Sequence, residues 1–423
     1  MMLHLDIDAF FVSAHRSRDV SLLNKPVAVG GRSNLKIFEN KNMNMKLFDQ
    51  NRGAFVNPVF YNNQKQNFNE FFVDNKNNSK LIRGIVTTSS YEARKYGVKT
   101  GMSLSKALQL CPSLVVVVPD YVLYHKLSHS LYEYLSYEIP AIEQFSIDEF
   151  FADVDGWVAP EDVFAFASHL QRNVMDKFTI PISIGISSSK WIAKLATNDA
   201  KPYGIKIVHK NEIPSFIESV PIHDFPGIGK GYTNRLEKYF IKTLGEASRS
   251  KELFYKWGKS GKQLYHRIIG DDREYLLPKS NRKSIGISRT FDPIYDRKEI
   301  FRRIMILVRH VVYLVLKHQV NPTTYYLKLN YDYGQRVKGR KTINRIFNET
   351  LCKSIYENLL LELDNGSGFI TKVSISVSNF SEHKKTFSLL DLENDLRDKK
   401  LSQSIHDLRE KYSLDIIKSA NEL

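Results

Sequence analysis

The sequence predicts an α+β protein built from more than one domain. The chain has 423 residues with an apolar content of 42%, enough for sizeable cores, and a prior of about 150 residues per domain gives two to four domains. Strand and helix patterns alternate over residues 114–186 in the order strand, helix, hairpin, helix, strand. This order favours an α+β sheet with helices on one face, and a second, smaller α+β unit is expected after residue 284.

The first strand is predicted from strict alternation over residues 2–8. The apolar side chains at positions 3, 5 and 7 fall on one face, whereas Asp6 falls on the other. Later strands are short apolar runs bounded by glycine or polar residues, and the helices repeat apolar residues every three to four positions. Strands are expected at 25–31, 85–89, 114–118 and 182–186, a hairpin at 145–154, and helices at 10–18, 104–110, 122–139, 160–177 and 190–199.

Residues 33–82 differ in character from their surroundings. They are rich in Asn and contain few aliphatic runs, so we expect a long, irregular surface insertion. Beyond about residue 210 the patterns indicate short helices, followed by a linker near 277–282. The C-terminal unit is expected to hold extended segments at 285–291, 325–331 and 371–377, helices at 300–316 and 348–363, and from 381 a charged tail with a helix near 401–412.

The net charge of +15 is unevenly distributed along the chain. Residues 276–345 contain sixteen Lys or Arg against four Asp or Glu, a surplus of twelve positive charges that accounts for most of the total. A basic balance predicts a polyanionic partner, either nucleic acid or an acidic membrane surface. The concentration of charge in one segment favours contact with a phosphate backbone.

Several classes of protein can be set aside. The two cysteines, Cys111 and Cys352, are too few for a disulfide framework or a four-cysteine zinc site. The N-terminal residues include two aspartates and no basic segment, so a signal peptide is not expected. The apolar helix at 300–316 is interrupted by three arginines and a histidine, and we therefore expect it in a core and not in a membrane.

Two adjacent carboxylates, Asp148 and Glu149, lie in the stretch EQFSIDEFFAD at 143–153. An Asp-Glu pair at a hairpin tip is an ordinary surface feature. A metal site is the other interpretation, because a divalent cation offsets the cost of burying carboxylates. That interpretation needs a third carboxylate, and Asp6 supplies it if its strand lies beside the hairpin. Three carboxylates around two Mg²⁺ ions are suited to phosphoryl transfer.

Six ordered motifs resemble those of the Y-family DNA polymerases, the translesion enzymes of the DNA polymerase IV and UmuC type. The motifs are LDIDAFFVS at 5–13, TSSYEARKYGV at 88–98, SIDE at 146–149, GISSSKWIAKLATNDAKPYGI at 185–205, PGIG at 226–229 and RKSIG at 282–286. The resemblance covers about residues 1–32 and 84–380. It implies a multidomain right-hand polymerase of the α+β class, with palm, fingers, thumb and a DNA-gripping little finger domain.

The resemblance also implies domain bounds for this chain. The implied domains are a catalytic palm at 1–10 and 115–208, fingers at 11–114 with the Asn-rich insertion at about 33–82, a helical thumb with a helix-hairpin-helix at 209–275, a linker at 276–283, an α+β little finger at 284–380 and a C-terminal tail at 381–423.

The metal ligands implied by the resemblance are Asp6, Asp148, Glu149 and the backbone carbonyl of Ile7, which would hold two Mg²⁺ ions or Mn²⁺ in their place. Asp8 lies on the same strand face as Asp6, but the family does not use that position as a principal ligand.

The implied nucleotide-binding residues are Phe10, Phe11, Thr88, Tyr91, Arg94 and Lys201. Tyr91 and Arg94 are three positions apart, on one side of a turn, and the guanidinium is a fork of donors suited to phosphate oxygens. Lys201 precedes a proline, which biases it to an extended conformation at a helix end. The residue matching Phe11 is the family's steric gate, whose ring excludes a 2′-hydroxyl. Singly, these residues would be read as core aromatics and solvated cations.

DNA contacts are expected in two places. The turn PGIG precedes a predicted helix at 233–240 and exposes backbone N–H groups that bind phosphate without reading sequence. The second place is the basic C-terminal unit. The residues expected to contact DNA are Pro226, Gly227, Ile228, Gly229, Lys230, Arg282, Lys283, Arg336, Lys338, Arg340 and Lys341.

A segment near the C-terminus, Thr386–Leu390, resembles the peptide with which bacterial proteins bind the sliding clamp. Thr386 replaces the usual Gln, and Leu390 replaces the usual Phe. Phe387, Leu389 and Leu390 would be the apolar contacts. The alternative is a short apolar segment that docks on its own chain.

The expected function is a template-directed DNA polymerase that takes primer-template DNA and deoxynucleoside triphosphates, works with low fidelity past damaged bases, and is located in the cytoplasm without a membrane partner. Two alternatives are a Mg²⁺-dependent nuclease and a non-catalytic DNA-binding repair factor. A nuclease can use three carboxylates and a helix-hairpin-helix, but it needs neither a triphosphate-binding set nor a sugar gate. The presence of all three carboxylates counts against the non-catalytic factor.

Overall fold

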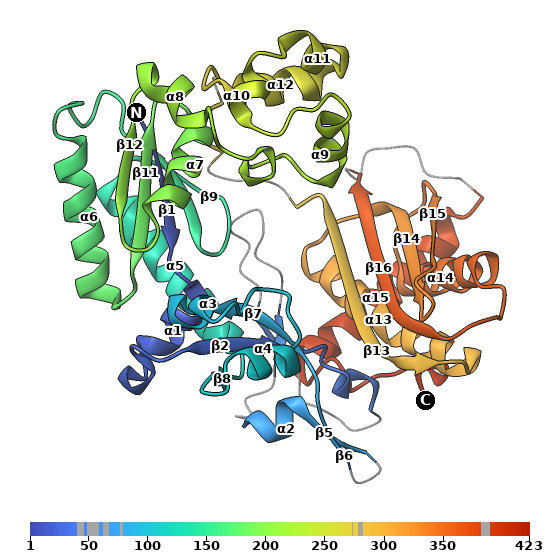
Figure 1. Cartoon of the computed structure of the whole chain (residues 1–423). Helices are drawn as coiled ribbons and strands as arrows, with labels where there is room; N and C mark the ends of the chain where they lie inside the picture. Colours follow the sequence, from blue (N-terminus) through green and yellow to red (C-terminus); the bar gives the residue numbers. More distant parts are fainter. Residues whose placement is uncertain are drawn as a thin grey trace. The chain divides into compact units, whose positions relative to one another are not determined.

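The computed structural model describes residues 1–39, 46–48, 59–61, 67–76, 79–272, 274–277, 282–381 and 390–423. The described chain forms two compact units (Figure 1). Unit 1 takes its described residues from Met1–Gly31 and Gln66–Ser280, and unit 2 from Arg32–Phe48, Val59–Lys65 and Asn281–Leu423. Among the described residues, no helix combines the length and apolar character needed to cross a bilayer.

A five-stranded sheet forms the centre of unit 1, in the order β12-β11-β1-β10-β9. Its strands are β1 (Met2–Ile7), β9 (Ala141–Gln144), β10 (Glu149–Asp153), β11 (Ile182–Ser187) and β12 (Ile205–Val208). Strand β1 pairs antiparallel with both β10 and β11. The first strand of the chain therefore lies in the middle of the sheet, as expected if Asp6 is to meet the acids of the hairpin.

Helices cover both faces of this sheet, so the prediction of helices on one face is wrong. The apolar side chains of β1 pack with those of α5 (Tyr121–Glu138) and α6 (Val163–Phe178) in one core. Helix α7 (Lys190–Ala200) packs against the opposite face, over β11 and β1 (Figure 1). Gly185 permits this close approach, because a Cβ there would collide with the Ala193 carbonyl and the side chain of Thr197.

The hairpin begins earlier than the sequence indicated. Its strands are β9 and β10, and residues 145–148 form the connection between them. Asp148 therefore lies in the connection, and Glu149 is the first residue of β10. In the register of the sheet, Glu149 lies opposite Asp6 on β1.

Unit 1 also contains a smaller sheet and a helical region. The smaller sheet has the order β7-β2-β8, so the strand near 115, expected in the palm, belongs to this sheet and not to the five-stranded one. Its elements are β2 (Val27–Gly31), β7 (Ile85–Ser89), β8 (Val115–Val117), α1 (Phe10–Arg16), α3 (Tyr91–Lys95) and α4 (Leu104–Leu110). The helical region is α8 (Ile213–Ile217), α9 (Lys230–Glu237), α10 (Leu244–Ser248), α11 (Lys251–Lys256) and α12 (Gly258–Ile268), which share one apolar core, so the prediction of short helices is confirmed.

Unit 2 is built on a four-stranded antiparallel sheet in the order β13-β16-β14-β15. The strands are β13 (Ser284–Ile294), β14 (Pro322–Tyr331), β15 (Arg336–Thr342) and β16 (Ile370–Phe380), and the helices α13 (Arg297–Lys317) and α14 (Glu349–Leu363) pack on one face. Strand β15 was missed because its sequence, RVKGRKT, is a basic edge strand with one apolar side chain.

The residues after 390 pack onto unit 2, so the prediction of a tail is wrong for them. Helix α15 (Leu392–Lys411) is longer than the helix expected near 401–412. The guanidinium of Arg309, which is 1% exposed, lies 2.7 Å from carboxylate oxygens of both Asp415 and Glu422, and Arg409 pairs with Glu349 at 2.7 Å. These contacts are ionic, so the segment has no apolar stripe that would reveal its packing in the sequence.

The expected insertion is not wholly irregular either. It contains β3 (Lys46–Phe48), β4 (Val59–Tyr61), α2 (Phe68–Phe72), β5 (Val73–Lys76) and β6 (Ser79–Ile82). Ile37 and Phe38 are buried in the core of unit 2. The Phe38 ring lies 6.2 Å from that of Phe291, and the guanidinium of Arg303 lies 4.6 Å from the Phe38 ring centroid. Arg302 donates a hydrogen bond of 2.9 Å to the Phe38 carbonyl.

Phe38→Ala should therefore destabilise unit 2, because it empties a ring-sized space in a packed core. We expect the free energy of unfolding to fall by about 3 kcal/mol. The measurement is denaturant unfolding of the full chain, with Glu39→Ala as the control, because Glu39 is exposed and next in sequence. A Phe38→Ala variant as stable as this control would contradict the packing of the segment.

Candidate active site

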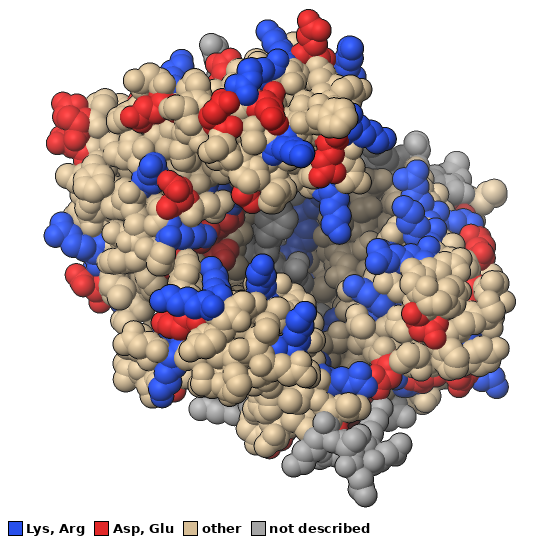
Figure 2. Space-filling view, in the orientation of Figure 1, with Lys and Arg blue, Asp and Glu red and all other residues tan. Residues whose placement is uncertain are grey.

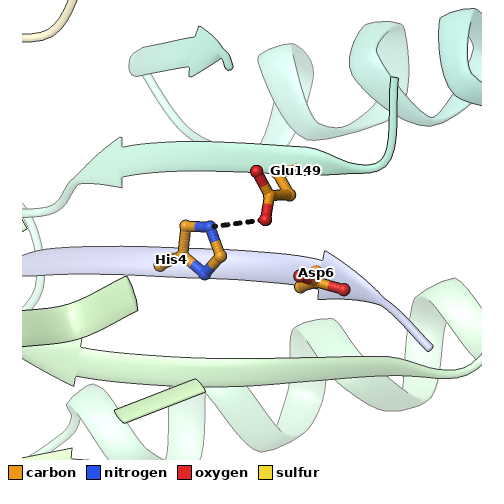
Figure 3. Close-up of side chains that lie close together, drawn as sticks. All are labelled: His4, Asp6 and Glu149. Atoms are coloured by element: carbon orange, nitrogen blue, oxygen red, sulfur yellow. Dashed lines mark ion pairs between the residues drawn. The ribbon is translucent and has the colours of Figure 1, made fainter. Parts of the chain in front are cut away.

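Two carboxylates and a histidine converge where β1 and β10 lie side by side (Figure 3). One ligand atom from each of His4, Asp6 and Glu149 lies within 4.8 Å of the other two. Asp148 comes from the connection before β10, and its carboxylate accepts a hydrogen bond of 2.5 Å from the Ser146 hydroxyl. Sequence reasoning placed the three acids near one another, and the register of β1 with β10 brings Asp6 and Glu149 together.

Burial makes this place costly for negative charge. It raises the pKa of Asp6 to about 7, partly opposed by Lys201, and it also raises the pKa of Asp148. Lys201 Nζ lies 2.8 Å from Asp6 Oδ2, and Lys194 Nζ contacts a carboxylate oxygen of Glu149. Two ammonium groups thus balance the carboxylates. Carboxylate oxygens are the ligands that divalent cations such as Mg²⁺ prefer. The carboxylates gathered here therefore fit the predicted metal.

His4 was not predicted as part of the site. Its Nδ1 lies 2.8 Å from Thr197 Oγ1, and its Nε2 lies 4.0 Å from a carboxylate oxygen of Glu149. Burial and then the nearby lysines lower the pKa of His4, so the ring is neutral. Its place on the Asp6 face of the strand was visible in the alternation, but nothing in the sequence indicated the bond to α7.

Two of the predicted triphosphate residues lie at the same strand end: the Tyr91 hydroxyl donates to Asp8, and Lys201 pairs with Asp6. Tyr91 and Arg94 belong to α3, and the Arg94 guanidinium stacks 4.5 Å from the Tyr91 ring centroid while its Nε donates to the Ser89 carbonyl at 3.1 Å. Lys201 follows α7 and reaches Asp6. Thr88 lies in β7, opposite Val29 of β2.

The two adjacent aromatic residues Phe10 and Phe11 lie in different environments. Phe10 is 2% exposed and belongs to the core, whereas Phe11 is partly exposed. The Phe11 ring stacks on Tyr124 of α5, with centroids 4.2 Å apart and planes 12° apart. The Tyr124 hydroxyl lies 2.7 Å from His15 Nε2. Tyr124 is thus held in place behind the predicted gate, and sequence reasoning did not identify it.

The turn at Pro226–Gly229 leads directly into α9. Gly227 has a φ of +99°, a conformation that glycine adopts without strain. Gly229 precedes the first residue of the helix, Lys230, and among the described residues no side chain caps this end. The first N–H groups of α9 are therefore open to a hydrogen-bond acceptor, and their contact with DNA phosphate stays a prediction.

The basic residues of unit 2 fall on two faces of its sheet. Arg336, Lys338 and Arg340 alternate with Val337 and Gly339, which lie opposite buried leucines of β14, so these three basic residues belong to the open face. The same face carries serines of β16, and Lys and Arg gather over β15 and β16 in the space-filling view (Figure 2). Lys341 belongs to the other face, where its Nζ lies 4.0 Å from a carboxylate oxygen of Glu362 on α14.

The other predicted contacts are less clearly placed. Arg282 lies 2.8 Å from His318 Nε2, and Lys283 is exposed just before β13. In the clamp-like segment, Leu390 is 95% exposed, and Phe387 and Leu389 lie outside the described residues.

Comparison with known proteins agrees with this architecture. The sequence pattern of the impB/mucB/samB family matches residues 57–198, and that of the impB/mucB/samB family C-terminal domain matches residues 282–389. The DNA polymerase IV of Clostridium kluyveri is 28% identical over 438 residues, covering 99% of this chain and 96% of the relative. The DNA polymerase IV of Bacillus anthracis is 27% identical over 433 residues, covering 100% and 93%.

Solved structures show the same fold. A Y-family DNA polymerase chimera matches with a TM-score of 0.69 at 20% identity, covering 90% of this chain and 98% of the other. The insertion ternary complex of Dbh DNA polymerase matches with a TM-score of 0.54 at 21% identity, with the same coverage. The two family matches together span more than half of the chain, in the order that the motifs require. The chain therefore belongs to the impB/mucB/samB family and is a Y-family polymerase of the DNA polymerase IV type.

Proposed function

We propose that this protein is a DNA-directed DNA polymerase, a nucleotidyltransferase that adds deoxynucleotides to a primer 3′ end with low fidelity and synthesises past damaged template bases. The observation that carries the proposal is the pairing of Asp6 with Glu149 across β1 and β10, beside Lys201. Its full-length relatives are named DNA polymerase IV. The proposed active site needs acids for metal and cations for a triphosphate, and the pairing of Lys201 with Asp6 supports this assignment.

The proposed metal ligands are Asp6, Asp148, Glu149 and the carbonyl of Ile7, which would hold two Mg²⁺ ions or Mn²⁺ in their place. When bound, such ions lower the pKa of a hydroxyl nucleophile and stabilise the triphosphate and its leaving pyrophosphate. The donor set is all oxygen, as hard divalent cations require.

Other side chains are proposed to bind the triphosphate and to exclude a ribose. Arg94 and Lys201 bring positive charge to the triphosphate, and Tyr91 places a hydroxyl beside them. Burial raises the pKa of Tyr91, so this hydroxyl keeps its proton and remains a donor. Thr88 contributes a further phosphate contact. Phe11, supported from behind by Tyr124, occupies the volume that a ribose 2′-hydroxyl would need.

Primer extension distinguishes this function from its rivals. The full chain is incubated with a primer-template, deoxynucleotides and Mg²⁺, on undamaged, abasic and adducted templates. Stepwise lengthening of the primer supports a polymerase. Shortening of either strand without deoxynucleotides would support a Mg²⁺-dependent nuclease, and DNA binding without either change would support a non-catalytic repair factor.

We also propose that the open face of the unit 2 sheet and the start of α9 hold the DNA backbone. Lys338→Ala/Arg340→Ala should weaken DNA binding and flatten the dependence of log affinity on log salt, by about 0.9 for each phosphate that the variant no longer neutralises. The control is Lys341→Ala, which removes a lysine from the same strand but from the face covered by α14. Equal slopes for the double variant and this control would remove the open face from the DNA site.

Contact with a sliding clamp stays a prediction for Thr386–Leu390. Tethering would raise the local concentration of the polymerase at a primer end. The test compares clamp-stimulated extension by the parent and by Leu389→Ala/Leu390→Ala; equal stimulation would favour the alternative that the segment docks on its own chain. Because the proposed substrate is the DNA of the cell, we place the protein in the cytoplasm.

A further inference from the structure

Asp8 is a buried carboxylate that the proposed chemistry does not use. It follows β1 directly and is 2% exposed. Three donors from three separate parts of unit 1 meet its two oxygens. The Ser183 hydroxyl lies 3.0 and 2.9 Å from Oδ1 and Oδ2, the Tyr91 hydroxyl donates to Oδ1 at 3.1 Å, and the Tyr203 N–H donates to Oδ2 at 2.7 Å.

Two of these donors belong to the two parts of the proposed triphosphate site, here called the Tyr91 arm and the Lys201 arm. Tyr91 is the first residue of α3, the helix that also carries Arg94. Tyr203 is two residues beyond Lys201, and its φ of +51° is uncommon for a residue with a side chain. The hydrogen bond to Asp8 holds this turn, and with it the place from which Lys201 extends.

The bonding of Asp8 also differs from that of the metal acids. Among the described residues, no Lys or Arg forms an ion pair with Asp8, whereas Asp6 and Glu149 each meet a lysine. A buried carboxylate is costly without compensation, and here hydrogen bonds alone provide it. Asp8 is therefore hydrogen-bonded to both arms, so a single side chain can fix the position of each.

We propose that Asp8 is a positioning residue for the triphosphate: before nucleotide binds, it holds the Tyr91 arm and the turn that carries Lys201 in fixed positions. The inference rests on the proposed function. The Tyr91 hydroxyl has one proton, so a phosphate oxygen takes over this hydrogen bond from Asp8 when nucleotide binds. The exchange needs only rotation of the O–H bond, because the ring is already in place, and Asp8 keeps its bond to the Tyr203 N–H.

The test is Asp8→Asn in the full chain. Asn has nearly the same shape as Asp but only one acceptor oxygen. Donors that now meet the second carboxylate oxygen would face an NH2 group in its place. We expect the KM for the incoming deoxynucleotide to rise roughly tenfold to a hundredfold, with kcat at saturating nucleotide changed by less than about threefold. Equilibrium titration of the protein-DNA complex with deoxynucleotide should show a matching loss of affinity.

Two further variants separate positioning from local folding. Ser183→Ala removes the donor that belongs to neither arm, so it should change KM by less than about twofold. In the Tyr91→Phe background, Asp8→Asn should cost less affinity than in the parent, because one of the two arms is already released. A non-additive result of this kind supports coupling through Tyr91.

Each other result overturns the inference. An active parent whose KM is unchanged by Asp8→Asn would show that the arms do not depend on Asp8. A fall in kcat with KM unchanged would place Asp8 in the chemical step. Equal effects of Ser183→Ala and Asp8→Asn on KM would indicate general disturbance of the strand end. Absence of primer extension by the parent would overturn the proposed function, and the inference with it.

Discussion

Asp148→Ala is expected to lower the rate of nucleotide incorporation about a thousandfold or more, while affinity for primer-template DNA stays nearly unchanged. Asp148 lies in the connection just before β10, and Glu149, the first residue of β10, lies opposite Asp6; neither belongs to the surfaces proposed to hold DNA. Loss of one carboxylate removes a proposed metal ligand and leaves the surfaces proposed to hold DNA unchanged. Single-nucleotide incorporation at saturating DNA, with a separate DNA-binding titration, measures the two effects.

The control for this prediction is Asp153→Asn. Asp153 ends the same strand, and its carboxylate lies 3.5 Å from the N-terminal amine at the far end of β1. Removing that charge should leave incorporation within about twofold of the parent, because a surface ion pair contributes little. Near-normal extension by Asp148→Ala would refute the metal assignment, and an equal loss in the Asp153 variant would mean that the sheet itself is disturbed.

Much of the acid site could be predicted because it depends on short-range rules. Alternation over residues 2–8 placed Asp6 on a face away from the leucines, and the structure puts β1 between β10 and β11. The ordered motifs then supplied the partners Asp148 and Glu149. The two-residue period of a strand and the order of the motifs are properties of the linear sequence, so both can be recognised before the fold is known.

The remaining parts of the site depend on contacts between distant residues. Asp6 meets Lys201 and His4 meets Thr197, at separations of more than 190 residues, and neither pairing leaves a local pattern. Asp8 is the sharpest case. Its alternation with Asp6 was visible in the sequence, but its partners come from α3, β11 and the turn after α7. Only the fold shows that one aspartate lies among the proposed metal ligands and the other among hydrogen-bond donors.

Two segments were misjudged because composition is a poor guide to packing when the contacts are few or polar. The segment at 33–39 contributes two apolar side chains, Ile37 and Phe38, to a core whose other members are far away in sequence. Helix α15 buries Arg409 against Glu349 in place of an apolar stripe. Both segments have the sequence pattern of a surface segment, and contacts with distant residues bury them nonetheless.

Phe11→Ala is expected to remove most of the discrimination against ribonucleotides, because the gate works by volume. The ring stacks 4.2 Å from Tyr124, which prevents it from moving away from a 2′-hydroxyl. Without the ring, the ratio of kcat/KM for deoxynucleotide to that for ribonucleotide should fall at least about a hundredfold, equivalent to roughly 2.7 kcal/mol. Incorporation of the deoxynucleotide itself should fall much less, since the groups proposed to bind its phosphates are all retained.

Phe11→Tyr is the matched control, since it keeps the ring and should keep the discrimination. Tyr124→Leu provides the complementary variant: it retains Phe11 but removes the stacked support, so the ring gains freedom and discrimination should fall by an intermediate amount. This graded order, with Phe11→Ala below Tyr124→Leu and Tyr124→Leu below the parent, follows only if a held ring excludes the hydroxyl. If Phe11→Ala discriminates as well as the parent does, the sugar is read by another group, and the stacking on Tyr124 is core packing alone.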